Sequence, residues 1–206
     1  MFTQKWKTSE RQHEVLVERD SRIPLRDGTI LSGDLFRPAA EGKFPVVLGA
    51  HPYNCEIQTA PLRPIGYGNL RGYIEAGDPA FLVRRGYVQA VINVRGTGKS
   101  QGQFQMMGPL EVQDVCDVIQ WLAAQPWSDG NVGMFGVSYF AWLQIQVAAL
   151  NPPPGVADGP TRHAMTCRHC LIRGKLHAAE RFWSCGSFAP WLAPCRPWSH
   201  RPIAAV

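Results

Sequence analysis

Apolar runs and helical repeats alternate along the first 150 residues. Taken in order, the predicted elements are a β-hairpin over 13–24 and 30–36, strands at 44–50, 87–94 and 131–135, and helices at 80–85, 109–122 and 138–150. The hairpin turns at Asp27-Gly28, a D-G signal. The three later strands are continuous apolar runs, typical of strands buried on both faces of a sheet. Strands that alternate with helices predict an α/β fold with a mostly parallel sheet and helices on both faces.

The stretch from 132 to 141 carries the clearest chemical signal. An apolar strand runs into Gly136, Ser138 stands two residues later, and an apolar helical pattern follows at once. This order is typical of a nucleophile elbow, in which a sharp turn lifts the serine hydroxyl out of the sheet. The usual pattern is G-x-S-x-G, and Phe140 stands at its last position. The motif alone therefore leaves a second interpretation open, a buried strand followed by an N-cap serine.

Composition indicates a globular protein and divides the chain near residue 151. The 206 residues are 45% hydrophobic and 18% charged, which suits one domain with a core. Residues 1–151 hold 14 basic and 14 acidic residues, whereas residues 152–206 hold seven and two, so the net charge of +5 predicts no nucleic-acid partner. The N-terminus is polar and no long apolar run occurs, so we expect a cytoplasmic protein without a membrane span. In that compartment the six cysteines are not expected to form disulfides.

Six motifs, of which the elbow is the last, stand in order between residues 26 and 141. They are R-D-G at 26–28, L-F-R-P at 35–38, P-Y at 52–53, R-G-x-G-x-S-x-G at 95–102, Q-P-W-S-D-G-x-V-G-M at 125–134 and G-V-S-Y-F-A at 136–141. In this order they resemble the X-Pro dipeptidyl-peptidase and cocaine-esterase (CocE/NonD-type) family of α/β-hydrolases. The family's elbow is G-x-S-Y-x-G, so Phe140 fits it and Ala141 is the departure. The resemblance covers about residues 20–151 and implies an α/β-hydrolase fold truncated after the elbow helix.

The resemblance also implies roles for three residues. Ser138 would be the nucleophile, Tyr53 would lend its hydroxyl to the oxyanion hole, and the backbone N–H of Tyr139 would be the second donor. Two donors about 3 Å from the developing oxyanion are what acyl transfer requires. The implied reaction is cleavage of an ester, an amide or a peptide with a penultimate proline through an acyl-serine. The expected partner is thus a small ester or peptide substrate, with no cofactor and no metal. The sequence does not indicate the oligomeric state.

Two other motifs were weighed against this interpretation. Residues 93–100 nearly match a Walker A loop, but Asn93 replaces the first glycine, so a P-loop-like nucleotide binder ranks third among the hypotheses. Cys167 and Cys170 have zinc-ligand spacing, but Cys185 and Cys195 are ten residues apart and form no second pair.

Residues 152–206 form an irregular tail rich in Pro, Cys, His and Arg. A serine nucleophile needs a base and an orienting acid, and the formal candidates in the tail are Asp158, Glu180, His163, His169, His177 and His200. Asp158 lies only twenty residues beyond Ser138, whereas a further βα unit takes about 30 residues. The acid and base are therefore expected to be missing.

Two interpretations of this tail stay open, an irregular or disordered extension and an out-of-frame translation that begins near residue 151. In either case the elbow strand is expected to have an open apolar edge, which predicts aggregation or poor folding. The activity would be impaired by the truncation. The alternative function is a catalytically dead remnant or binding module that keeps the pocket without the triad.

Overall fold

The structure, a computed structural model, describes residues 9–53, 55–58, 75–150 and 165–167. It contains a six-stranded sheet with the strand order β1-β2-β4-β3-β5-β6. The strands are β1 (Val15–Pro24), β2 (Ile30–Pro38), β3 (Phe44–His51), β4 (Val88–Asn93), β5 (Ser128–Gly136) and β6 (Met165–Cys167). The helices are α1 (Cys55–Gln58), α2 (Pro79–Val83), α3 (Pro109–Ala123) and α4 (Tyr139–Ala149).

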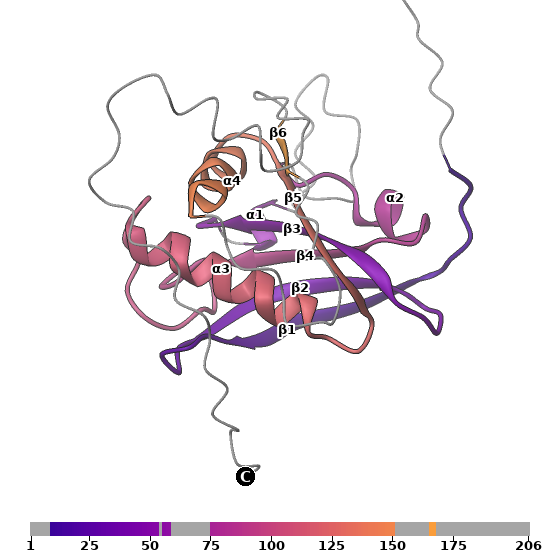
Figure 1. Ribbon diagram of the computed structural model, residues 1–206, viewed down its shortest axis with the longest axis horizontal. Coiled ribbons are helices and arrows are strands. Elements are labelled where there is room, and N and C mark those ends of the chain that lie inside the picture. Colours follow the sequence, from indigo (N-terminus) through magenta and orange to yellow (C-terminus); the bar gives the residue numbers. More distant parts are fainter. Residues whose placement is uncertain (1–8, 54, 59–74, 151–164, 168–206) are drawn as a thin grey trace, which may run out of the picture.

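The sheet is mixed, and its larger part is parallel (Figure 1). β2 pairs antiparallel with both β1 and β4, whereas β4, β3, β5 and β6 are parallel to one another. The predicted hairpin is confirmed: Pro24 pairs with Ile30, and Gly28 takes a φ of 85° in the turn between them. The predicted α/β fold with a mostly parallel sheet is therefore confirmed.

Alternation along the central strands divides the core between the two faces of the sheet. Ala90 and Ile92 of β4 belong to the larger buried cluster, to which α3 and α4 contribute. Val91 points the other way and packs in a smaller cluster with Val83 of α2. Figure 1 shows α3 and α4 close together at the left of the view, and α2 apart from them at the right. Helices thus cover both faces, but α2 is only five residues long.

The start of β5 differs from the sequence prediction. The pattern predicted a strand over 131–135, whereas the strand begins at Ser128, which is buried and pairs with Phe44. The register shifts between this pair and the next, and Gly130 has a φ of 83°. Residues 128–130 are therefore the irregular first part of a longer strand, which pairs with β3.

β6 corrects the expectation of an open edge beside the elbow strand. Met134 of β5 pairs with Met165, and Gly136 pairs with Cys167. At Met134, β5 therefore has a paired neighbour on each side, β3 and β6. The rest of residues 152–206, with the two interpretations of that segment, lies outside the described residues.

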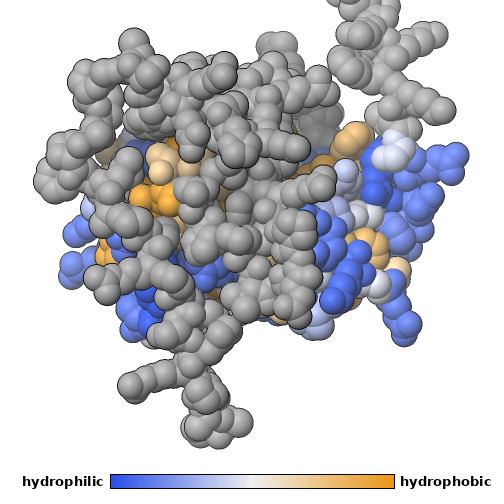
Figure 2. Space-filling model, in the orientation of Figure 1, coloured by the Kyte–Doolittle hydropathy of each residue, from blue (hydrophilic) through white to orange (hydrophobic). Residues whose placement is uncertain are grey.

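The described surface is largely polar on the face that Figure 2 shows, and apolar residues stand there in small groups between hydrophilic ones. This distribution agrees with a core that holds most of the apolar side chains between the sheet and its helices. In the described ranges, no helix combines the length and the apolar character needed to cross a bilayer.

Candidate active site

The turn between β5 and α4 holds Ser138 in an unusual backbone conformation. Its φ of 60° and ψ of −121° lie in a region that residues with a side chain rarely occupy. Two backbone hydrogen bonds fix the turn: the N–H of Val137 donates to the carbonyl of Glu75 at 3.0 Å, and that of Trp142 donates to the carbonyl of Ser138 at 3.0 Å. The strand, sharp turn and helix that the pattern predicted are all present here.

Gly136 and Phe140 form the packed base of this turn. A Cβ added to Gly136 would lie 2.2 Å from the Cβ of Phe140, so no larger residue fits at position 136 without movement. The Phe140 side chain is fully buried, and its ring stacks on that of His51 with centroids 4.8 Å apart. Phe140, which stands where the common elbow motif has glycine, therefore supports the turn from below.

Tyr53 follows β3, the strand that pairs with β5, and its hydroxyl reaches Ser138 through a side-chain hydrogen bond. The Asn93 side chain donates to the Tyr53 carbonyl, and the Tyr53 ring lies 6.0 Å from that of His51 and 6.2 Å from that of Tyr139. Burial raises the pKa of Tyr53, and the nearby charge of Glu75 raises it further. The hydroxyl therefore keeps its proton at neutral pH and can donate it to an anion.

Tyr139 has two separate parts in the site. It is the first residue of α4, so its backbone N–H is one of the helix N-terminal groups without an intrahelical acceptor. Its side-chain hydroxyl points away into the core and donates to Glu111, 2.7 Å from Oε1 and 2.8 Å from Oε2. Burial and the Glu111 carboxylate raise the pKa of Tyr139. The side chain thus anchors α4 to α3, and the backbone faces the turn at Ser138.

Glu75 is a site residue that the sequence reasoning missed. Its carboxylate hydrogen-bonds the side chain of Ser138, and its backbone N–H donates to Oε1 of Gln58 at 3.3 Å. Burial raises the pKa of Glu75, whereas the hydrogen bonds to Ser138 and Gln58 lower it. No motif or periodicity marks this residue, because it reaches Ser138 only through the tertiary path of the chain before α2.

The His51 ring is stacked with that of Tyr53, with centroids 6.0 Å apart. Its side chain is fully buried, stacks on Phe140, and has its Nε2 atom 3.7 Å from the Sγ atom of Cys55. Burial lowers the pKa of His51 to about 4, so the ring is neutral at pH 7. The acids and histidines that the sequence offered as triad partners, from Asp158 to His200, lie outside the described residues.

The loop that resembles a Walker A motif has structural contacts of its own. Lys99 forms an ion pair with Asp20, and the Ser100 hydroxyl donates to the carbonyl of Asn93 at 2.8 Å and accepts from the N–H of Ser32 at 2.9 Å. A P-loop needs a helix directly after the Lys-Ser pair, and α3 begins only at Pro109. The loop therefore braces the N-terminal hairpin, which argues against the nucleotide-binding hypothesis.

Potential metal ligands do not cluster in the described part of the chain. Among those residues, no group of three or more His, Cys, Asp or Glu side chains lies where it could hold a metal ion. The side chains of Cys167 and Cys170, the zinc-ligand candidates, lie outside the described residues.

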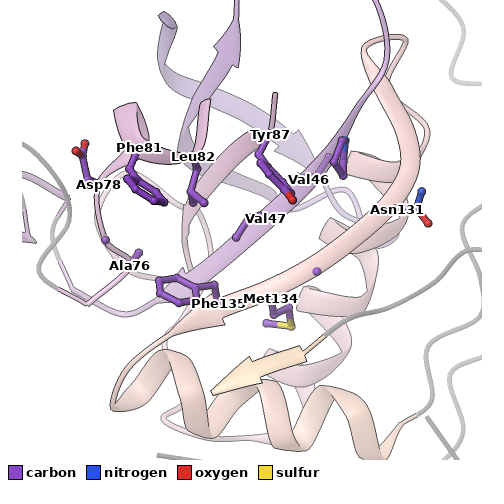
Figure 3. A pocket seen from close by; sticks show the side chains of 13 residues that line it. Val46, Val47, Ala76, Asp78, Phe81, Leu82, Tyr87, Asn131, Met134 and Phe135 are labelled. Atoms are coloured by element: carbon purple, nitrogen blue, oxygen red, sulfur yellow. The ribbon is translucent and has the colours of Figure 1, made fainter. Parts of the chain in front are cut away.

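A pocket of about 640 Å³ lies on the α2 face of the sheet, next to the site (Figure 3). Figure 3 shows Phe81 and Leu82 of α2 on one side of β3 and Phe135 of β5 on the other. The pocket is lined by Pro45, Val46, Val47, Ala76, Gly77, Asp78, Phe81, Leu82, Tyr87, Asn131, Gly133, Met134 and Phe135. Tyr53, Ser138 and Tyr139 do not line it, so this pocket is distinct from the group of side chains around Ser138.

A family model described as X-Pro dipeptidyl-peptidase (S15 family) matches residues 27–187. The match continues past residue 151, into the segment whose composition changes. Among curated relatives, the cocaine esterase of Rhodococcus sp. (strain MB1 Bresler) is 36% identical over 126 residues, which are 61% of this chain and 20% of the relative.

Solved structures give the same result for the fold. A CocE/NonD family hydrolase from Staphylococcus aureus superposes with a TM-score of 0.60 and 38% identity, covering 68% of this chain and 26% of that one. An α-amino acid ester hydrolase superposes with a TM-score of 0.53 and 26% identity, covering 74% and 26% of the two chains. The predicted α/β-hydrolase fold is thereby confirmed. The chain spans about a fifth to a quarter of the length of these relatives.

Proposed function

Because the chain belongs to the X-Pro dipeptidyl-peptidase (S15) family of hydrolases, we propose that it is a serine hydrolase that cleaves an ester or amide bond through an acyl-Ser138 intermediate. The observation that carries this proposal is the backbone of Ser138, held at a φ of 60° between β5 and α4 with the Tyr53 hydroxyl in contact with its side chain. A strained turn of this kind presents a serine hydroxyl above the sheet.

The proposed mechanism uses three groups of the site. The Oγ atom of Ser138 attacks the substrate carbonyl, and the oxygen of that carbonyl becomes an oxyanion. The Tyr53 hydroxyl and the Tyr139 backbone N–H donate hydrogen bonds to it. Tyr53 is suited to this work because its raised pKa keeps the hydroxyl protonated. The N–H of Tyr139 adds the positive end of the α4 dipole.

The substrate class is proposed at the level that the relatives share. Their names include both a cocaine esterase and an α-amino acid ester hydrolase, and the family model describes a dipeptidyl-peptidase. This chain covers only a part of each. Both small esters and peptides with a penultimate proline therefore belong in the test.

The test combines covalent labelling with turnover on the full 206-residue chain. A fluorophosphonate probe is expected to label Ser138, as located by mass spectrometry, and a panel of p-nitrophenyl esters and Xaa-Pro p-nitroanilides is expected to include a substrate. Ser138→Ala should abolish both results. Ser9→Ala, at an exposed position, is the matched control and should change neither.

Either result decides between the two functional hypotheses. Labelling and turnover that require Ser138 support the hydrolase. A folded chain that neither labels nor turns over any of these substrates contradicts it, and favours the remnant or binding module that lacks a working triad.

A further inference from the structure

Asn93, the last residue of β4, extends a buried side chain toward the loop that carries Tyr53. It pairs in register with His51, the last residue of β3, and only 4% of it is exposed. Its Nδ2 atom donates a hydrogen bond to the Tyr53 carbonyl, and its Oδ1 atom accepts one from the Cys55 thiol, with Sγ at 3.2 Å. A single amide therefore binds the chain on both sides of residue 54.

The chemistry of these two partners determines which way the amide faces. A backbone carbonyl only accepts hydrogen bonds, so it must meet the Nδ2 hydrogens of Asn93, and the thiol of Cys55 can then donate to Oδ1. The reversed amide would bring Oδ1 against the Tyr53 carbonyl and leave two buried acceptors face to face. Asn93 therefore holds the segment after β3 in one arrangement.

The glycine-rich loop at 95–102 packs against this amide. Gly98 takes a φ of 53°, and a Cβ added to it would lie 2.5 Å from Oδ1 and 2.7 Å from Cγ of Asn93. The Ser100 hydroxyl donates to the Asn93 carbonyl at 2.8 Å. Two residues of the loop that resembles a Walker A motif thus fix Asn93, Gly98 by close contact with its side chain and Ser100 by a hydrogen bond to its backbone.

From this geometry we propose that Asn93 is a positioning residue for the oxyanion hole, which holds Tyr53 in place and is itself held by the loop at 95–102. The inference rests on the proposed function, in which the Tyr53 hydroxyl donates to the oxyanion. Tyr53 lies between β3 and α1, outside both elements, so contacts of this kind rather than regular pairing set its position. Asn93 would act through Tyr53 and not on the substrate.

The position of Tyr53 matters because an oxyanion donor works only at a short distance. A donor must lie about 3 Å from the oxyanion, and a misplacement of about 1 Å can cost a hundredfold in rate. The Tyr53 ring packs near those of His51 and Tyr139, with centroids 6.0 and 6.2 Å away. Apolar packing is non-directional. The hydrogen bond from Asn93 instead fixes the backbone from which the hydroxyl extends.

Fluorophosphonate labelling of Ser138 in the full chain tests the inference, because the phosphoryl oxygen of the probe takes the place of the oxyanion. The rate constant of labelling should fall about 10- to 100-fold in Asn93→Ala, a loss no larger than removal of a donor would give. Gln12→Ala, which shortens an exposed amide side chain, is the control and should label at the wild-type rate.

A double-mutant cycle with Tyr53→Phe distinguishes positioning from a general loss of structure. Tyr53→Phe removes the hydroxyl that Asn93 is proposed to place, so in that background Asn93→Ala should lower the rate by less than about twofold. A substitution that only loosens the fold would lower the rate by the same factor in both backgrounds.

Gly98→Ala tests the same arrangement from the side of the loop. Its methyl group would displace the Asn93 amide, so labelling should slow in the wild-type background and change little in the Tyr53→Phe background. Gly28→Ala also introduces a methyl group at a positive φ, 85°, but nothing lies within 4 Å of it, and this control should label at the wild-type rate.

The outcomes separate this inference from the proposed function. If the wild type labels at Ser138 and Asn93→Ala labels equally fast, or slows by the same factor with and without the Tyr53 hydroxyl, the inference is wrong and the hydrolase proposal stands. A wild type that does not label contradicts both. If Asn93→Ala does not fold by circular dichroism, the Gly98→Ala cycle decides in its place, and equal slowing in both backgrounds, or none, overturns the inference.

Discussion

The hydroxyl of Tyr139 donates to both carboxylate oxygens of Glu111, and this contact joins the first turn of α4 to the first turn of α3. The N–H of Met107 also donates to Glu111, at 2.8 Å from Oε2. Glu111 is buried, and its burial raises its pKa although both hydrogen bonds oppose that rise. The turn at Ser138 therefore depends on a buried carboxyl group that takes no direct part in the proposed reaction.

Tyr139→Phe removes a donor from this buried group. We expect the free energy of unfolding to fall by about 1–3 kcal/mol, because a buried acceptor then lacks one of its hydrogen bonds. Urea unfolding followed by circular dichroism measures the loss. Tyr87→Phe, at an exposed position, is the control and should change the stability little. Equal stability of the wild type and Tyr139→Phe would show that Glu111 is satisfied in another way.

The raised pKa of Glu111 predicts that the free energy of unfolding depends on pH. Its folded-state pKa is raised above the usual 4.5, so the native state holds the proton to a higher pH than the unfolded state does. As pH rises from 4.5 through the folded pKa, the unfolded state loses its proton first, and the stability of the wild type decreases relative to that of Glu111→Gln. Melting temperatures of the two proteins across this range measure the difference. Glu41→Gln, at an exposed position, should run parallel to the wild type.

Gly136→Ala tests the close packing beneath the turn. The added Cβ would meet the Cβ of Phe140 at 2.2 Å, and overpacking at a site that cannot yield costs about 1–3 kcal/mol or more. Gly28→Ala also adds a methyl group, but nothing lies within 4 Å of it, so it bears only the strain of a φ of 85°. We expect Gly136→Ala to lose more stability than Gly28→Ala in urea unfolding, and to label more slowly with a fluorophosphonate.

A double-mutant cycle separates this overlap from other effects of Gly136→Ala. In a Phe140→Gly background the Cβ and ring atoms that the methyl group at position 136 would meet are absent, so Gly136→Ala should cost less there than in the wild type. Equal costs in the two backgrounds would assign the effect to the backbone of the turn instead.

The buried ion pair of Arg95 should contribute far more to the free energy of unfolding than the exposed ion pair of Lys99. Its guanidinium donates to Asp114 at 2.7 and 2.8 Å and to Asp27 at 2.8 Å, and the side chains of Arg95 and Asp114 are only 12% and 4% exposed. Arg95→Ala leaves the Asp114 carboxylate buried without this partner and should cost about 3–5 kcal/mol. Lys99→Ala breaks the exposed pair with Asp20 and should cost less than about 1 kcal/mol. Similar losses in denaturant unfolding would contradict the buried role of Arg95.

Much of this architecture was predictable, because its signals are local. Short apolar runs and helical repeats mark the strands and helices of residues 13–150, and the D-G turn marks the hairpin. Tyr53 and Ser138 follow β3 and β5, which are adjacent parallel strands, so their loops meet at one edge of the sheet. Sequence order and strand pairing together are enough to bring these two residues close to each other.

The remaining features depend on contacts that no local pattern records. Glu75 contacts the turn at Ser138 because of the path that the chain takes before α2. A single acidic residue at this position belongs to no motif or repeat in the sequence. Phe140 fits the motif of the family, but only the packed structure shows that it fills the space next to Gly136. β6 is three residues long, too short for an apolar period to stand out, and it is defined by its pairing with β5.

Tyr53→Phe tests the proposed oxyanion hole and leaves the other side chains of the site unchanged. The substitution removes only the hydroxyl, so the ring contacts with His51 and Tyr139 remain and the stability should change little. Loss of one oxyanion donor typically lowers kcat by about 10²–10³-fold. The measurement is turnover of an ester or Xaa-Pro substrate identified with the wild type, with Tyr87→Phe as the matched control. A decrease in kcat with little change in KM supports a group that acts in the transition state. Unchanged turnover would show that Tyr53 only packs beside Ser138, and would leave the Tyr139 N–H as the proposed donor.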